Sequence, residues 1–323
     1  MADNNSFSPC ARLHLPHRST PTLTARRPEC TDLKGPRVLF NSHIDTVPPY
    51  IPARVETALD GDLVIWGRGA CDTKGILAAQ LTALQHLVDG GCSDAGLLYV
   101  VSEETDHSGM LASNDLGLDP DFLVVGEPTG SKMMRLQKGM LKMRLECKGV
   151  ACHSGYPQLG KSAIDPLVAV LQRLNDTKWP ASEELGATTL NIGLVNGGQA
   201  ANALAEHAEA TLMFRLTDEP EVVLAIVKSI LEGTDVTMQI ITQNSPVKLA
   251  VLPGFETDVA AYNTDIAYFN FTGKALLYGP GSIHHAHSRT EKILGSEITA
   301  AIDAYTKIAA IALGSATTVP VSM

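Results

Sequence analysis

Short apolar runs alternate with longer segments of helical character in the first third and at the end of the chain. The runs have the length of buried strands and occupy residues 37–40, 63–66, 97–101, 122–125 and 275–278. Residues 74–88 and 297–313 are predicted as helices, and Gly90 and Gly91 end the first of them. Strands that alternate with helices predict an α/β fold with a mostly parallel sheet.

The middle of the chain has a different pattern. Residues 140–148 alternate between apolar and polar side chains, as half-buried strands do. The predicted order is strand 140–148, helix 161–175, strands 188–195 and 207–216, helix 220–231 and strand 236–242. This β-α-β-β-α-β order is that of a ferredoxin-like unit. We therefore predict an inserted domain over residues 136–245, within a discontinuous α/β domain formed by residues 36–135 and 246–323.

Residues 1–35 show no periodicity, and we expect them to form a disordered leader. Residues 4–28 contain no acid and four arginines, a composition similar to that of a mitochondrial transit peptide. Prolines 9, 16 and 21 oppose the amphipathic helix that such a peptide needs. No apolar signal-peptide core opens the chain. The expected location is the cytosol, with the mitochondrion as the alternative.

Composition excludes several classes of function. The chain has 45% hydrophobic and 19% charged residues, as globular proteins do. Its net charge of −10 disfavours general binding of nucleic acid. No apolar run is long enough to span a membrane. The six cysteines contain no C-x-x-C pair, which indicates a reducing compartment rather than a disulfide framework.

Acids and histidines follow the ends of the predicted strands. His43 and Asp45 come after residues 37–40, and about one such His-x-acid match is expected by chance. However, further residues of this kind follow the other strands: Asp72, Glu103, Glu104, Glu127 and His287. Each alone has a structural explanation, such as a helix N-terminal acid for Asp72. Together they lie where open α/β sheets bind ligands, and two histidines with three carboxylates suit a pair of metals such as Zn²⁺.

A family resemblance rests on a series of motifs in a fixed order. These are SHIDTVPP, GRGACDTKG, SEET, GEPT, GVACHSG, GGQAANAL and GPGSIHHAH. The set resembles the dinuclear zinc amidohydrolases and peptidases, which include acetylornithine deacetylase, succinyl-diaminopimelate desuccinylase, aminoacylase and glutamate-type carboxypeptidases. The resemblance implies a zinc-binding α/β domain with an inserted dimerisation domain, and two Zn²⁺ per subunit, for which Co²⁺ can substitute.

The resemblance also implies roles for residues of the α/β domain. Glu103 would be the general base, and Asp45 would orient the ring of His43. A cis peptide is expected between Asp72 and Thr73. The competing ligand His285 is set aside because the Ala-His order of the family motif selects His287. The implied metal ligands are His43, Asp72, Glu104, Glu127 and His287, with Asp72 as the bridge.

Three residues of the inserted domain match further family positions. His153 would reach the active site of the partner subunit and donate to the developing oxyanion, so the enzyme would be a homodimer. Asn202 and Arg215 would hold a substrate carboxylate, to which the arginine fork is suited. The alternatives are a surface loop histidine for His153 and an exposed strand residue opposite Glu209 or Asp218 for Arg215.

The expected function is hydrolysis of the amide bond of an N-acyl amino acid or short peptide with a free carboxylate. The stretch around GVACHSG is most similar to acetylornithine deacetylase-like members. A metallocarboxypeptidase acting on short peptides is the alternative, and so is an inactive dimer-forming relative, because only 42 residues precede His43. A dinucleotide-dependent oxidoreductase is disfavoured because the chain lacks G-x-G-x-x-G after its first strand.

Overall fold

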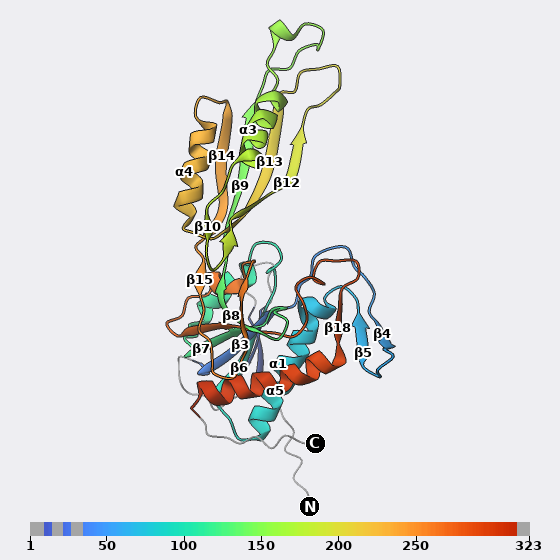
Figure 1. The fold of residues 1–323 in the computed structure, drawn as a ribbon, viewed down its shortest axis with the longest axis vertical. Coiled ribbons are helices and arrows are strands. Elements are labelled where there is room, and N and C mark those ends of the chain that lie inside the picture. Colours follow the sequence, from blue (N-terminus) through green and yellow to red (C-terminus); the bar gives the residue numbers. More distant parts are fainter. Residues whose placement is uncertain (1–9, 15–21, 27–34, 315–323) are drawn as a thin grey trace, which may run out of the picture. The chain divides into compact units, whose positions relative to one another are not determined.

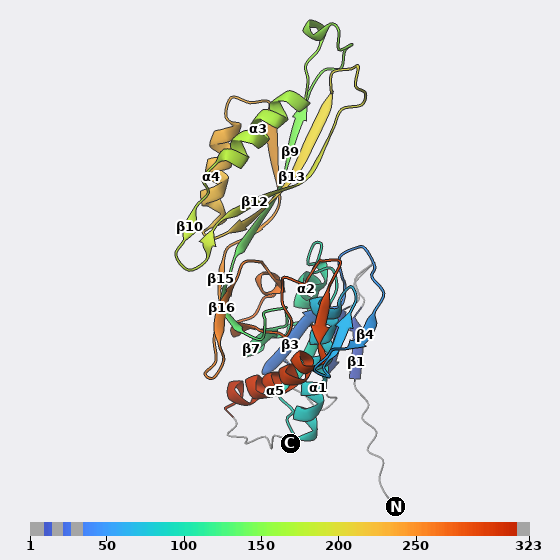
Figure 2. The same cartoon turned by 45° about the vertical axis from the view of Figure 1, so that its right-hand side comes forward.

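A computed structural model describes residues 10–14, 22–26 and 35–314. The chain divides into two compact units, which Figures 1 and 2 show in two views. The first unit comprises Met1–Arg135, Leu249–Asp258 and Thr264–Met323, and the second comprises Leu136–Lys248 and Val259–Asn263.

The first unit is built on a mixed sheet with parallel strands at its centre. Strand β3 lies between β6 and β7 and is parallel to both, and β17 is parallel to β7. Strands β2 and β8 pair antiparallel on the two sides. The order is β1 (Cys10–His14), β2 (Thr22–Arg26), β6 (Ala95–Val100), β3 (Val38–His43), β7 (Phe122–Val125), β17 (Lys274–Leu277) and β8 (Met133–Gln137). The predicted mostly parallel α/β fold is confirmed.

Two long helices cover one face of this sheet. Helices α1 (Gly75–Asp89) and α5 (Gly295–Ala312) lie side by side in both views (Figures 1 and 2). They bury alternate residues of the strands, as shown by Phe40, whose ring lies edge-on to Tyr305 at a centroid distance of 5.4 Å. All six residues of β3 are buried, because a central parallel strand is covered on both faces. The packing of β3 between its neighbours therefore holds His43, its last residue, in a defined position.

The structure differs from the expected disordered leader. Strands β1 and β2 pair with each other, and β2 extends the sheet beyond β6. The sequence signal was weak because each strand has only five residues, and the strand β6 with which β2 pairs lies some seventy positions away along the chain. The remaining residues of 1–34 lie outside the described part of the chain.

The apolar run 63–66 also differs from expectation. It forms β5 (Leu63–Trp66), which belongs to a separate antiparallel sheet with β4 (Arg54–Thr57) and β18 (Lys292–Leu294). The ring of Trp66 lies beneath Arg54 on β4 and Lys292 on β18, at 4.7 and 4.9 Å from its centroid. A run of four apolar residues predicts a strand but not the sheet it joins. Asp72 therefore approaches the site from this smaller sheet.

The second unit has the predicted ferredoxin-like order. Its antiparallel sheet follows β12 (Thr189–Gly197), β13 (His207–Leu216), β9 (Gly139–Lys148) and β14 (Val236–Asn244). Helices α3 (Ile164–Asp176) and α4 (Pro220–Leu231) pack on one face, over alternate residues such as Leu141, Met143 and Phe214. Buried positions alternate along β13 and along β9 from Leu141 onward, which explains why the sequence pattern was readable.

Shorter elements complete the two units. They are α2 (Ser108–Ser113), β10 (Ala181–Ser182), β11 (Gly186–Ala187), β15 (Val247–Lys248), β16 (Thr257–Ala260), and the short helical turns η1 (Ala70–Lys74), η2 (Asn114–Leu116), η3 (Pro157–Leu159) and η4 (Asp265–Tyr268). Within the described residues, none of the helices combines the length and the apolar content needed to cross a bilayer.

Candidate metal centre and active site

His43 ends the central strand and is 1% exposed. Its Nε2 atom lies 3.1 Å from Oδ1 of Asp72 and 3.8 Å from Oε1 of Glu127. Its Nδ1 atom faces Asp45, at 3.1 Å from the backbone oxygen and 3.5 Å from the carboxylate. One ring nitrogen therefore faces other candidate ligands, while the opposite one faces Asp45.

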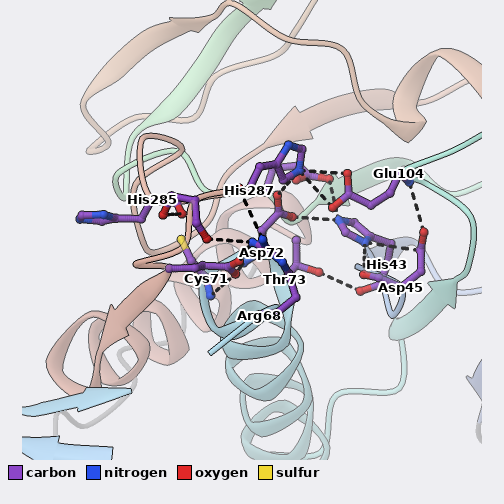
Figure 3. A network of polar contacts seen from close by, with 12 residues as sticks. His43, Asp45, Arg68, Cys71, Asp72, Thr73, Glu104, His285 and His287 are labelled. Atoms are coloured by element: carbon purple, nitrogen blue, oxygen red, sulfur yellow. Dashed lines mark hydrogen bonds and ion pairs between the residues drawn. The ribbon is translucent and has the colours of Figure 1, made fainter. Parts of the chain in front are cut away.

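Asp72 lies between two imidazoles. Its Oδ1 atom faces His43, and its Oδ2 atom lies 3.3 Å from Nε2 of His287 (Figure 3). The residue sits in the turn η1 before α1 and is 5% exposed. The peptide to Thr73 is cis, and the Thr73 hydroxyl donates to the backbone oxygen of His43 at 2.8 Å. The two oxygens of one carboxylate thus point at two different histidines, which is the arrangement of a bridging ligand.

Glu104 accompanies His287. The Nε2 atom of His287 lies 3.1 and 3.0 Å from the two carboxylate oxygens of Glu104. Figure 3 shows His287 directed at this cluster and His285 directed away from it. The loop after β6 is held by Asp45, whose carboxylate accepts hydrogen bonds from the backbone N–H groups of Glu103 and Glu104 at 3.3 and 3.2 Å.

Glu103 and Glu127 lie on the other side of His43. Donor atoms of His43, Glu103 and Glu127 lie within 4.8 Å of one another, and so do those of His43, Asp72 and Glu104. Glu127 follows β7 and is 5% exposed. The residues predicted from the ends of four separate strands and one turn are therefore gathered around His43 in the first unit.

The cluster carries more negative charge than its own residues offset. Burial raises the pKa of Glu103 and of Glu127, and although the charge of His43 opposes the rise, neighbouring carboxylates reinforce it. Hydrogen bonds to Asp72 and Glu104 raise the pKa of His287 to about 10. Burial disfavours the charged form of His43, but hydrogen bonds to Asp45 and Asp72 outweigh it and raise the pKa of that ring. Added positive charge, from protons or from metal ions, is therefore favourable in this cluster.

Four further polar residues lie near this cluster and were not predicted from the sequence. Arg68 and Glu291 form a buried ion pair beside Asp72. His107 is buried and stacks on Tyr268, with Nδ1 2.9 Å from Asp265. Donor atoms of His107, Asp265 and Glu103 lie within 4.8 Å of one another. The available sequence signals for Arg68 and Glu291 were the Gly-Arg-Gly order before Asp72 and the acid four residues after His287.

The three site residues predicted in the inserted segment belong to the second unit. His153 and Asn202 lie on exposed loops that the structure brings together, because Ser154 N–H donates to the backbone oxygen of Asn202 at 2.9 Å. Gly155 N–H donates to Nδ1 of His153 at 3.0 Å. Arg215 lies on β13, opposite Met140 of β9 and Thr189 of β12. Glu209, considered as its partner, lies 3.7 Å from Arg144 instead.

Comparison with known proteins gives a consistent result. Residues 135–237 match the M20 peptidase dimerisation domain. A peptidase M20 domain-containing protein of Schizosaccharomyces pombe is 38% identical over 281 residues, which cover 85% of this chain and 69% of that protein. A probable carboxypeptidase of Paracoccidioides brasiliensis is 36% identical over 308 residues, covering 84% of this chain and 70% of the relative.

Solved structures share the fold at lower sequence identity. A tripeptidase from Staphylococcus aureus has a TM-score of 0.69 and 20% identity, with 91% of this chain and 85% of the tripeptidase covered. A dinuclear metal-binding M20 peptidase from Bacillus subtilis has a TM-score of 0.60 and 14% identity, with 92% and 86% covered. The resemblance found in the motifs is therefore confirmed, and the chain belongs to the M20 family of metallopeptidases.

Proposed function

We propose that this M20 enzyme cleaves a peptide or N-acyl amide bond with the help of two Zn²⁺ ions held in the cluster around Asp72. The observation that carries the proposal is the position of the Asp72 carboxylate, with one oxygen 3.1 Å from His43 and the other 3.3 Å from His287. Glu127 would complete the set that contains His43, and Glu104 the set that contains His287.

The donor chemistry fits such ions. Imidazole nitrogens and carboxylate oxygens are ligands that Zn²⁺ accepts, and Co²⁺ accepts the same atoms. The raised pKa values of the buried acids indicate a site that favours added positive charge. When bound, the ions would polarise the scissile carbonyl and lower the pKa of the attacking water.

Glu103 is the residue that we assign as general base. Glu103 follows β6, directly before Glu104, and lies close to His43. Its raised pKa suits a group that must take up a proton near neutral pH. In this role it takes a proton from the attacking water and later delivers it to the leaving amine. Asp45 keeps the Glu103–Glu104 backbone in place while the two side chains serve different tasks.

The proposed substrate carries a free carboxylate. Arg215 and Asn202 would bind a free carboxylate of the substrate, as the family resemblance implies. The related protein from Paracoccidioides is named a probable carboxypeptidase, which favours a peptide with a free C-terminus over acetylornithine. We therefore place carboxypeptidase activity first, and acetylornithine deacetylation, which the motifs favoured, second.

A homodimer is part of the proposal. The match to a peptidase dimerisation domain supports it, and so does the free edge of the second unit's sheet, where β12 pairs only with β13 among the described strands. Leu194 and Val195 on β12 are 61% and 56% exposed, and Val168 on α3 is 55% exposed. An apolar edge strand of this kind pairs readily with a second copy. His153 would act across that dimer on the partner's substrate.

The first test joins metal content to hydrolysis. We expect two zinc equivalents per chain by elemental analysis, and hydrolysis of C-terminal residues from short peptides that a chelator abolishes. The assay panel includes N-acetylornithine and other N-acyl amino acids beside the peptides. Faster turnover of N-acetylornithine would replace the carboxypeptidase assignment with the deacetylase. Two metals without turnover of any compound would favour the inactive relative.

Replacement of Glu103 should separate catalysis from metal binding. For Glu103→Ala we expect a fall in kcat of about 10²–10⁴-fold, because general-base catalysis contributes on that order. Elemental analysis should still find both metals. Glu104→Ala is the matched control and should lose one metal. If Glu103→Ala loses the metal and Glu104→Ala keeps it, the two roles are exchanged.

Metal removal should destabilise the protein more at higher pH. The folded-state pKa of His287 is raised to about 10, so its protonated form stabilises the metal-free fold below the unfolded value of about 6.5. That stabilisation is lost as the pH rises between these values, whereas bound zinc replaces the proton. The melting-temperature gap between zinc-loaded and chelated protein should therefore be larger near pH 8.5 than near pH 6. An equal gap at both pH values would contradict His287 as a ligand.

The role of His153 across the dimer can be tested by mixing two variants. His153→Ala should lower kcat by about 10²–10³-fold, the cost of one oxyanion donor, with the dimer intact by light scattering. When this variant is mixed in equal amounts with Glu103→Ala and subunits exchange, about half of the dimers become heterodimers. In each heterodimer one of the two sites has both Glu103 and His153, so about a quarter of all sites should regain activity. No recovery, with heterodimers shown by differential tagging, would exclude action in trans.

A further inference from the structure

A buried carboxylate next to the cluster holds the turn that carries Asp72. Glu291 is 2% exposed, and its Oε1 atom accepts hydrogen bonds from the backbone N–H groups of Cys71 and Asp72, both at 3.1 Å. Its Oε2 atom lies 2.6 Å from Nη1 of Arg68, and both side chains are almost fully buried. One oxygen of this carboxylate thus binds the turn that carries Asp72, and the other binds Arg68.

The guanidinium of Arg68 extends the contact to the segment that carries His287. Nη2 of Arg68 donates to the backbone oxygen of His287 at 3.4 Å, and Nη1 donates to that of Ser288 at 3.2 Å (Figure 3 shows Arg68 beside Asp72). Backbone hydrogen bonding adds to this, because Gly67 N–H donates to the backbone oxygen of Glu291 at 3.1 Å. The ion pair joins residues 223 positions apart in the sequence.

The arrangement repeats what Asp45 does on the other side of the site. Asp45 accepts from two consecutive N–H groups, those of Glu103 and Glu104, and faces the ring of His43. Glu291 accepts from two consecutive N–H groups, those of Cys71 and Asp72, and is linked through Arg68 to the backbone of His287. Each carboxylate therefore fixes one ligand-bearing turn and one histidine.

We propose that Arg68 and Glu291 form a positioning pair, which sets Asp72 and His287 at the spacing that a metal ion needs. The inference rests on the proposed two-metal function and adds two residues to it. A carboxylate is required at position 291 because it must accept from two backbone N–H groups and from the guanidinium at once. Arginine is required at position 68 because its planar guanidinium serves Glu291 and the backbone oxygens of Pro49, His287 and Ser288 together.

Two conservative variants separate the two halves of this pair. In Glu291→Gln, the amide nitrogen must face either Arg68 or the two backbone N–H groups, so one set of hydrogen bonds is lost. In Arg68→Lys, a single ammonium keeps the charge of the ion pair but loses the fork that reaches the His287 segment. Glu297→Gln is the matched control, because it also removes a nearby acidic group. Glu297 accepts a hydrogen bond from Leu294 N–H, and the amide oxygen of glutamine can still accept it.

The experiment has two readouts on the full chain. Calorimetric titration of metal-free protein with Zn²⁺ gives the affinity of each metal. Thiol labelling of the metal-free protein, followed by mass spectrometry of each cysteine, reports whether the turn at Cys71 stays closed, since this thiol is fully buried. Cys147, which is also buried but belongs to the second unit, serves as the internal reference.

We expect Glu291→Gln to weaken zinc binding by about 10–100-fold and to speed the labelling of Cys71 but not of Cys147. Arg68→Lys should weaken one metal selectively and leave Cys71 protected, a pattern that general destabilisation does not produce. If both variants match Glu297→Gln within twofold in both readouts, the pair has no positioning role. If Glu291→Gln does not fold, the selective loss in Arg68→Lys decides the question.

Failure of the two-metal function would look different. Wild-type protein that binds no Zn²⁺ would contradict the proposed function, and the labelling of Cys71 would then decide alone whether Glu291 holds the turn. Accelerated labelling of Cys71 in Glu291→Gln would keep the positioning role in that case, and unchanged labelling would reject it.

Discussion

The contact on which the rest of the site depends is that of the Asp72 carboxylate with two imidazoles. One oxygen faces His43 and the other faces His287, and Glu104 and Glu127 extend the group on either side. So many acids gathered in a partly buried space repel one another unless cations offset them. Protons on the histidines and buried acids can do this in the metal-free chain. A divalent ion offsets this repulsion with twice the charge of a proton, and it can also activate an amide bond.

The sheet brings these residues together because parallel strands end at one edge. Strands β3, β6 and β7 are adjacent, and His43, Glu103 with Glu104, and Glu127 follow their carboxyl ends. The apolar packing of α1 and α5 on one face keeps those ends in register. These three strands supply four of the residues of the site, and the other two come from other segments. Asp72 arrives from the small β4–β5–β18 sheet and His287 from the long segment after β17.

This division explains what the sequence could predict. His43, Glu103, Glu104 and Glu127 follow clear apolar strands, so position along the chain was enough to place them at one edge. The ferredoxin-like unit was readable because buried and more exposed residues alternate along most of β9 and all of β13. The separate sheet of β5 and the pairing of β2 with β6 were not readable, because short strands carry no signal for their distant partners. Arg68 and Glu291 were missed for the same reason: neither stands out alone, and their meaning comes from a contact across 223 positions.

The proposed metal ligands stand mostly on turns and loops, which by themselves hold a side chain loosely. Two of these turns are each held by a carboxylate that comes from a different segment. Asp45 holds the backbone of Glu103 and Glu104, and Glu291 holds that of Cys71 and Asp72. Each of these carboxylates is in turn linked to a histidine of the cluster, directly or through Arg68. The turns are therefore positioned by one another, and the geometry of either half of the site depends on residues of the other half.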